Sequence, residues 1–230
     1  ANSVEEAEAI ARKLPASGIK TMFDAGMAEV RRTQDLGLYT MRDARDHTMQ
    51  RVGRPKVESA QVAIAAINPE VQVTPVMARA DAALLDTLVA QADVVLDCCD
   101  NFTTRHAINA ACVKHRKPLV SGAAIRFDGQ VCVYDPRDAS SPCYACVFPN
   151  RPAPGMVPTC AEAGVAAPLP GVIGSMMAME AIKHITGAGQ TLRGRLMIHD
   201  ALYAETRVIA VHRRTDCPVC GDPQTSAMHT

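Results

Sequence analysis

Two Cys-x-x-Cys pairs are the clearest chemical signal in this sequence. Cys143 and Cys146 form the first pair, and Cys217 and Cys220 form the second pair near the end of the chain. Thiolates at this spacing can occupy adjacent corners of a tetrahedron around Zn²⁺, at Zn–S distances of about 2.3 Å. Four thiolates close the coordination shell, so we predict a structural zinc site that fastens the end of the chain to its middle. The alternative, a set of redox-active or merely buried thiols, is disfavoured by the presence of two pairs.

An acidic turn follows a short apolar run that begins at Val94. The run leads into Asp97, and Asp100 and Asn101 come shortly afterwards. Ligands of open α/β sheets bind beyond the carboxyl ends of the strands. Asp100 is therefore placed to hold a divalent cation that bridges phosphates, and Asn101 to bond a ribose or a nucleobase. The alternatives are that Asp100 or Asn101 caps the next helix, and that Asp97 is a strand-end acid facing the sheet edge.

A basic turn precedes the first clear helix. Arg51, Arg54 and Lys56 stand around Pro55, which suits the first turn of a helix. Backbone N–H groups at a helix start, together with Lys56, can bind an anion such as phosphate. Cations are unfavourable at this end of the helix dipole, so the pattern indicates either an anion-binding function or a solvated surface.

A lone cysteine, Cys160, lies in the long proline-rich segment 135–171, apart from both pairs. A loop of this length is usually functional or disordered. A thiol on such a loop can attack an activated carbonyl or sulfur if its pKa is lowered. The alternative is a small buried hydrophobic residue, as we expect for Cys98, Cys99, Cys112 and Cys132.

The elements that must position these residues follow from hydrophobic periodicity and capping signals. The patterns predict helices at 56–67, 81–91, 103–115 and 172–186, and strands at 71–76, 94–98, 119–123, 130–134, 195–199 and 206–211. The alternation of strands and helices favours an α/β fold with a parallel sheet and right-handed crossovers. Residues 1–50 are poorly patterned beyond a short amphipathic helix at 3–14, and residues 222–230 read as a tail.

Composition narrows the class of protein. The chain has 230 residues, with 24 basic and 24 acidic residues, so we expect neither a nucleic acid nor a membrane as partner. No run of 18 apolar residues is present, and the acidic start is unlike a signal peptide, so we expect a cytoplasmic protein. Nine cysteines in such a protein favour metal and thiol chemistry over disulfides.

From about His47 to Gly221 the sequence resembles the ThiF/MoeB/HesA family, bacterial relatives of the ubiquitin-activating enzymes. The motifs that carry the resemblance are Val52–Ala60 (VGRPKVESA), Asp97–Asn101 (DCCDN), Pro118–Ala123 (PLVSGA), Gly129–Val131 (GQV), Thr159-Cys160 and the two cysteine pairs. The resemblance implies a Rossmann-like, mostly parallel sheet with helices on both faces, C-terminal antiparallel strands and a zinc knuckle made only of cysteines.

The resemblance also implies a chemistry. Family members use ATP and Mg²⁺ to adenylate the C-terminal Gly-Gly of a ubiquitin-like sulfur carrier, such as ThiS or MoaD, before thiocarboxylate formation in thiamin or molybdopterin biosynthesis. Lys56 would then contact ATP phosphates, with Arg51 near the position of the family arginine, and Asp100 would hold Mg²⁺ beside Asn101. Cys160 resembles the cysteine that forms a thioester or acyl-disulfide in some members. A homodimer is implied as well, and the apolar helix 172–186 could serve core or interface.

The first fifty residues depart from the family pattern. The family opens with a strand, a Gly-rich G-x-G-x-x-G turn, a second strand ending in an acid and an Asn-Leu-x-Arg-Gln segment, and none of these is readable in residues 1–50. We therefore divide the chain into an atypical segment 1–50, a ThiF/MoeB-like domain with the zinc site at 51–221, and the tail 222–230. Since the glycine turn lets the backbone approach phosphate, its loss predicts weak ATP binding. The alternative function is a catalytically impaired, zinc-stabilised carrier-binding module.

Overall fold

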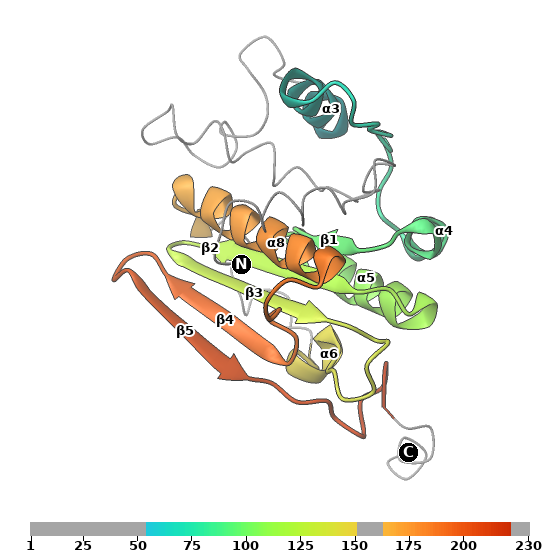
Figure 1. Cartoon of the computed structure of the whole chain (residues 1–230), viewed down its shortest axis with the longest axis vertical. Coiled ribbons are helices and arrows are strands. Elements are labelled where there is room, and N and C mark those ends of the chain that lie inside the picture. Colours follow the sequence, from blue (N-terminus) through green and yellow to red (C-terminus); the bar gives the residue numbers. More distant parts are fainter. Residues whose placement is uncertain (1–53, 151–162, 222–230) are drawn as a thin grey trace.

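The computed structural model describes residues 54–150 and 163–221. Figure 1 shows their arrangement in space, with α6 a single short turn. The elements, in chain order, are α3 (Lys56–Ile67), α4 (Ala82–Gln91), β1 (Val95–Asp97), α5 (Phe102–His115), β2 (Leu119–Ile125), β3 (Asp128–Tyr134), α6 (Tyr144–Val147), α8 (Pro168–Thr186), β4 (Arg195–Asp200) and β5 (Glu205–Ala210).

Most predicted elements are confirmed, and the strand expected at 71–76 is wrong. That segment has no strand pairing; instead the side chain of Gln61 on α3 donates a hydrogen bond of 3.0 Å to the carbonyl of Val73. The alternating pattern thus reflects an extended connection beside a helix. Elsewhere the bounds agree closely, although α8 begins four residues before the predicted Val172, at Pro168.

Local sequence fixes where these helices begin and end. Asp81 caps α4, the helix predicted at 81–91, by accepting the N–H of Leu84 at 2.9 Å. α8 ends at Gly187, which adopts the left-handed conformation with φ 72° that glycine reaches without a steric penalty. These signals set the ends of the helices that cover the sheet.

The sheet is mixed, which corrects the expectation of a mostly parallel sheet. Within the described residues its order is β1-β2-β3-β4-β5, and β1–β2 is the parallel pair, while the other neighbours run antiparallel. The reason is local: β2 and β3 are joined by only two residues, Arg126 and Phe127, and a connection this short permits only an antiparallel pair. Alternating hydrophobicity does not reveal strand direction, so the sequence pattern missed this.

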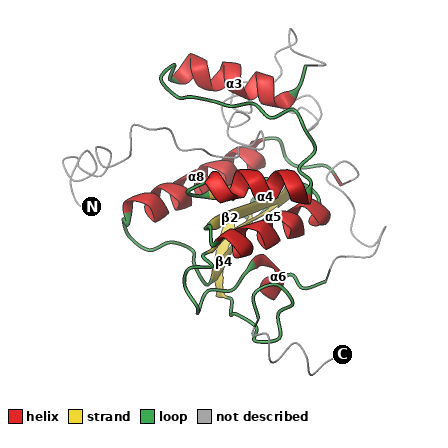
Figure 2. Cartoon of the chain, turned by 90° about the vertical axis from the view of Figure 1, so that its right-hand side faces the viewer, coloured by secondary structure: helices red, strands yellow, loops and turns green. Residues whose placement is uncertain are grey.

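Helices cover both faces of the sheet, as predicted. On one face Leu169, Ile173 and Met177 of α8 pack against the sheet core. On the opposite face α4 and α5 lie next to each other and contribute a second core layer that includes Leu85 and Ile108 (Figure 2).

Two glycines let α8 approach the sheet closely. A Cβ at Gly122 would lie 2.1 Å from Sδ of Met177, and a Cβ at Gly129 would lie 2.3 Å from Cδ1 of Ile173. Atoms cannot approach that closely, so a side chain at either position would force the facing side chain, Met177 or Ile173, or α8 itself to shift. Both glycines belong to the motifs by which the sequence resembles its family.

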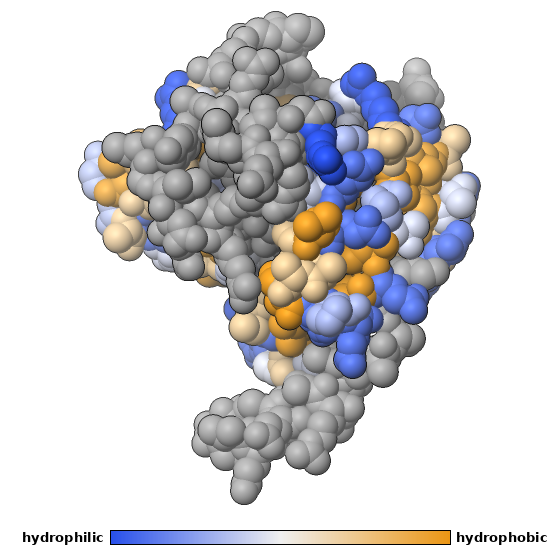
Figure 3. All heavy atoms as spheres, turned by 90° about the horizontal axis from the view of Figure 1, so that it is seen from above, coloured by the Kyte–Doolittle hydropathy of each residue, from blue (hydrophilic) through white to orange (hydrophobic). Residues whose placement is uncertain are grey.

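The surface mixes apolar and charged areas. Seen from above, orange apolar surface on the right of the view is broken up by hydrophilic residues (Figure 3). The β4–β5 hairpin exposes five large apolar side chains: Ile198, Leu202, Tyr203, Val208 and Ile209. Across the described ranges, none of the helices combines the length and apolar character that crossing a membrane requires.

Candidate active site and metal centre

The acidic turn after β1 is anchored by a buried carboxylate. The side chain of Asp97 has no solvent exposure, and its Oδ1 accepts the N–H of Cys99 at 2.9 Å. Its Oδ2 accepts the hydroxyl of Ser121, on the neighbouring strand β2, at 3.1 Å. Asp97 therefore does not face the sheet edge, which was the alternative considered from the sequence, but fixes the turn from inside.

Arg105 on α5 neutralises this carboxylate. Its Nη1 lies 3.2 Å from Oδ2 of Asp97, and its Nη2 donates to the carbonyls of Gly122, at 2.8 Å, and Cys99. Burial by itself lowers the pKa of Arg105, but the attraction of Asp97, together with smaller contributions from neighbouring groups such as Tyr144, holds that pKa above its usual value. The guanidinium thus joins α5, the turn after β1 and strand β2.

Sequence reasoning did not single out Arg105. The available signal was its place on the face of α5 that also carries Ile108 and Cys112, three and seven residues later, both of which are buried. A charged residue on a buried face requires a partner of opposite charge, and Asp97 and Asp100, eight and five residues earlier, were the nearby candidates in the sequence.

Asp100 and Asn101 stand on the outer side of this anchored turn. Asn101 is the N-cap of α5, where its side-chain oxygen accepts the N–H of Thr104 at 2.8 Å, so the capping alternative is confirmed for Asn101. Its amide nitrogen is left to bond a ligand. The carboxylate of Asp100 is exposed and forms no hydrogen bond or ion pair with another described residue. An exposed carboxylate suits Mg²⁺, which usually keeps several waters and needs only one or two carboxylates plus phosphates.

Lys56 is the first residue of α3, and its side chain is exposed. The N-cap is Pro55, which supplies no capping side chain, so the first turn of α3 remains open to an anion. A cavity of about 330 Å³ beside the same helix is lined by residues that include Arg54 and Ser59. Figures 1 and 2 show α3 standing apart from the sheet, and no described contact links Lys56 with Asp100.

Two predicted site residues, Arg51 and Cys160, lie outside the described residues, as do segments 1–50 and 222–230. Of the cysteines expected in the core, Cys112 and Cys132 are buried, and burial raises the pKa of each thiol to about 12. Cys98 and Cys99 are half-buried in the acidic turn.

The two Cys-x-x-Cys pairs meet at one point. The sulfur of Cys143 lies 3.9 Å from that of Cys146 and 3.7 Å from that of Cys217, and the sulfur of Cys146 lies 3.3 Å from that of Cys220. All four sulfurs fall within 4.8 Å of one another. A tetrahedral site with Zn–S bonds of about 2.3 Å requires sulfur–sulfur distances of about 3.8 Å. The cluster therefore has the dimensions of a four-thiolate metal site.

Two N–H groups donate to sulfurs of the cluster, and the pKa is lowered at one of its thiols, Cys146. The side-chain amide of Asn109 donates to Sγ of Cys143 at 3.6 Å, and the N–H of Arg214 donates to Sγ of Cys146 at 3.4 Å. The pKa of Cys146 lies below its usual value, chiefly because the thiol of Cys143 donates to it, and the pKa of Cys143 is raised in return. Four thiolates this close repel one another, so a metal cation is the natural partner of the fully ionised cluster.

Gly221 closes the second cysteine loop. Its N–H donates to the carbonyl of Cys217 at 2.8 Å, and a Cβ at this position would lie 2.4 Å from that carbonyl oxygen and 2.5 Å from the carbonyl oxygen of Thr215. Both obstacles are backbone atoms that cannot move aside, so only glycine allows the loop to turn this tightly around the sulfurs.

Comparison with known proteins finds clear relatives. The model of the ThiF family matches residues 37–219. The chain is 47% identical over 175 residues to the molybdopterin-synthase adenylyltransferase of Escherichia coli, and the aligned region covers 76% of this chain and 69% of that protein. It is 46% identical over 184 residues to the sulfur carrier protein adenylyltransferase of Thermus thermophilus, and this aligned region covers 78% of this chain and 67% of that protein.

A solved structure shares the fold at lower identity. Escherichia coli MccB, crystallised with MccA-N7isoASN, superimposes with a TM-score of 0.73 at 17% identity, over 93% of this chain and 69% of that chain. The chain thus spans about two thirds of the length of these relatives. The matched family region includes the acidic turn and Lys56, and it reaches the second cysteine pair as far as Val219.

Proposed function

The chain belongs to the ThiF family, and from this premise we propose that it adenylates the C-terminal carboxylate of a small sulfur-carrier protein with ATP. The observation that carries the proposal is the identity of 46–47% to two proteins named as adenylyltransferases, one of them of a sulfur carrier. The exposed carboxylate of Asp100, on a turn fixed from inside by a buried ion pair, supports it.

In the proposed reaction, a carboxylate oxygen of the carrier attacks the α-phosphorus of ATP. The bond between that phosphorus and the bridging oxygen breaks, pyrophosphate leaves and an acyl-adenylate remains. Negative charge gathers on the phosphates as this happens, so fixed positive charge lowers the barrier. We assign this role to Lys56 at the open start of α3 and to Arg51 close before it.

Asp100 would hold the Mg²⁺ that accompanies ATP, with Asn101 beside it to bond the ribose or the base. Mg²⁺ would supply charge neutralisation at the phosphates. Arg105 acts on this site through the backbone: it binds the carbonyl of Cys99, the residue directly before Asp100, so it positions the carboxylate without touching the ligand. We call it a positioning residue for that reason.

Cys160 is proposed for the later step that leads to a thiocarboxylate. Its thiolate would attack the acyl carbon of the adenylate, AMP would leave and a thioester would form. The acyl-disulfide of some family members would form instead if a sulfur donor had first converted Cys160 to a persulfide, which would attack the same carbon and again release AMP. The resemblance at Thr159-Cys160 supports this role.

We propose that the cysteine cluster holds structural Zn²⁺. The sulfur–sulfur distances and the two N–H···S contacts support this, and with four thiolates no coordination position remains for a substrate. The metal would join the segment after β3 to the segment after β5.

The carrier would dock on the β4–β5 hairpin. The five exposed apolar side chains defined above lie on this hairpin, with Ile198 and Ile209 on the same face of the two strands, and exposed apolar groups of this kind mark interaction surfaces. A homodimer remains a prediction, for which the exposed Val172 and Met179 on α8 offer an apolar surface.

The test is ATP–pyrophosphate exchange with a carrier that ends in Gly-Gly. We expect exchange that depends on the carrier and falls by about a hundredfold in Asp100→Ala. The matched control is Asp93→Ala, which removes an equally exposed carboxylate before β1. A carrier that lacks its last two glycines should give no exchange.

Absence of exchange with several carriers would refute the adenylation proposal. If those carriers still bound, with an affinity indifferent to ATP and Mg²⁺, the chain would instead be the catalytically impaired carrier-binding module. Binding that strengthens with ATP and Mg²⁺ would reject that alternative.

A further inference from the structure

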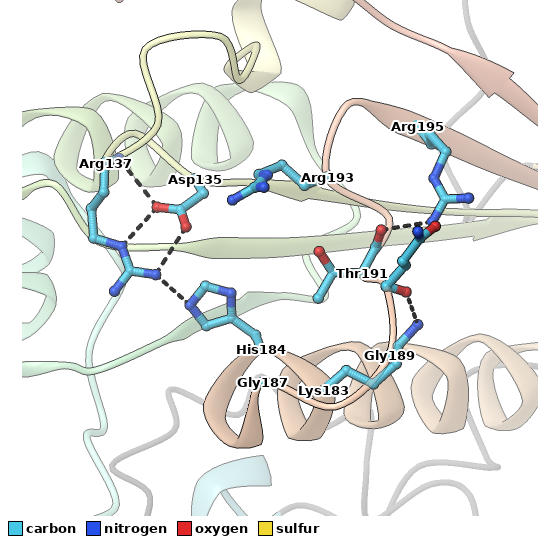
Figure 4. Close-up of a pocket in the computed structure, with 10 residues that line it drawn as sticks. Asp135, Arg137, Lys183, His184, Gly187, Gly189, Thr191, Arg193 and Arg195 are labelled. Carbon is cyan, nitrogen blue, oxygen red and sulfur yellow. Dashed lines mark hydrogen bonds and ion pairs between the residues drawn. The ribbon is translucent and has the colours of Figure 1, made fainter. Parts of the chain in front are cut away.

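A second cavity, of about 570 Å³, lies at the opposite end of the sheet from Asp100. It is lined by the segment after β3, the last turn of α8 and the loop that leads into β4 (Figure 4). Asp100 follows β1, which runs parallel to β2, whereas Asp135 of this cavity follows β3, which runs antiparallel to β2. The two sites are therefore separated by the length of the sheet.

Positive charge dominates the lining of this cavity. Four cationic side chains line it, with Asp135 as the one acidic residue among the described lining residues; the cations are Arg137, Lys183, Arg193 and Arg195. Arg193 pairs with Asp138 at 3.3 Å, and Lys183 with Glu180, so two further carboxylates offset part of the charge. Arg195 pairs with no carboxylate within the described part of the chain. The cavity thus retains an excess of one positive charge.

The cationic groups are held in place before any ligand arrives. Asp135 binds Arg137 through Nε at 2.8 Å and Nη2 at 2.9 Å. Arg195 donates from Nη2 to the carbonyl of Thr191 at 2.8 Å, and Lys183 donates to the carbonyl of Gln190 at 2.9 Å. Because these side chains already have fixed positions, a ligand need not order them, which lowers the entropic cost of binding.

His184 contributes an acceptor rather than a charge. Arg137 Nη2 lies 2.6 Å from Nε2 of His184, so the arginine donates and the imidazole accepts in its neutral form (Figure 4). The bond holds the second edge of the Arg137 guanidinium while leaving its positive charge beside the cavity.

The loop between α8 and β4 adds backbone donors. Its turns use left-handed glycines, Gly187 with φ 72° and Gly189 with φ 61°. The N–H groups of residues 189, 190 and 191 donate to no acceptor among the described residues. Successive unpaired N–H groups in a turn form a concave site that favours anions.

We propose that this cavity binds a small multivalent phosphate, either free polyphosphate or a phosphate monoester. Such a ligand matches the excess charge, the fixed guanidinium donors and the loop N–H groups, which together resemble the groups that recognise phosphate elsewhere. The proposal is independent of the adenylation reaction, since none of these residues belongs to the site around Asp100 and Lys56.

The test is titration of the full, zinc-loaded chain with inorganic triphosphate and, in a separate arm, glycerol phosphate, by calorimetry without Mg²⁺. We expect saturable binding to one of these probes, weakened about tenfold in Arg195→Gln and in Arg193→Gln, as loss of one charge-assisted hydrogen bond would produce. The matched control is Arg207→Gln on β5, an exposed arginine outside the cavity, which should leave the affinity unchanged.

The preferred probe identifies the source of the phosphate. Binding that is lost in Lys56→Gln and kept in both cavity variants would place the phosphate at the nucleotide site and overturn the proposal. An equal loss in Arg207→Gln would mean general charge attraction, and lack of saturation with both probes would refute the site. Arg193→Gln serves as the second variant if Arg195→Gln, at the start of β4, fails to fold.

Discussion

Replacing Arg105 with methionine should destabilise the whole domain and disable the acidic turn. Methionine fills a similar volume but removes the charge, so the fully buried carboxylate of Asp97 would lose its counter-ion. The carbonyls of Gly122 and Cys99 would lose a donor as well. Removing one partner of a buried ion pair typically costs about 3–5 kcal/mol, which is a large part of the roughly 5–15 kcal/mol that stabilises a native protein.

Urea unfolding followed by circular dichroism measures this effect. With a slope of about 2 kcal/mol per molar urea, the unfolding midpoint should fall by about 2 M. Lys114→Met removes a positive charge from the exposed side of the same helix and should change stability by less than about 1 kcal/mol, since exposed pairs contribute little. Pyrophosphate exchange by any Arg105→Met that folds should fall, because Asp100 loses its backbone anchor.

The double variant with Asp97→Asn tests the cause. Asparagine retains an acceptor for the N–H of Cys99 but carries no charge, so no unpaired charge is left buried when Arg105 is removed. We therefore expect the double variant to be about 1–3 kcal/mol more stable than the sum of the single effects. Strict additivity, or a cost below about 1 kcal/mol for Arg105→Met alone, would refute the assignment of this pair as the anchor of the turn.

Four further predictions concern other parts of the molecule. Gly122→Ala should cost about 1–3 kcal/mol in urea unfolding, because its Cβ would collide with Met177 and force that side chain or α8 to move. A zinc chelator should lower the melting temperature sharply, and metal analysis of the purified chain should find about one zinc per molecule; a chain that keeps its melting temperature without metal would contradict the structural role. Burial and the charges of Arg137 and Arg193 lower the pKa of His184, so the unfolded chain binds the proton more readily and stability should fall as pH drops below about 6.5; His184→Gln should flatten this decline in melts across that range. Tyr203→Ser, which removes an exposed ring from the hairpin, should weaken carrier binding about tenfold without changing ATP affinity in calorimetry. An unchanged affinity for the carrier would show that the carrier does not dock on the hairpin.

The helices could be predicted from the sequence because their signals are local. Asp81 and Asn101 sit where a cap is needed, and apolar periodicity fixed the extent of α3 and α5. Strand direction was missed because it depends on connections rather than on alternation, as the two-residue link between β2 and β3 shows. The meeting of the four cysteines was predicted because their paired spacing encodes the geometry of such a cluster directly.

The rest of the site depends on contacts between distant segments. The pairing of Asp97 with Arg105 across a turn, and the assembly of a basic cavity from three segments around Arg137, Lys183 and Arg195, arise only when the chain folds. The sequence around one residue does not predict such groupings, because each arginine considered alone is compatible with a solvated surface. Lys56 was predicted as an anion contact, and its exposed place at the start of α3 leaves that role a prediction.

The position of the cysteine cluster has a consequence for the integrity of the chain. Its two pairs bracket α8, β4, β5 and the segment before them, so the proposed metal would turn this stretch into a closed loop. A protease that cut the loop once would leave two fragments still tied together by the metal. Oxidation of the sulfurs would release the metal, and the outcome would then depend on which disulfides form. A disulfide between Cys146 and Cys220, whose sulfurs lie 3.3 Å apart, would keep the two fragments linked, whereas disulfides within each pair would not.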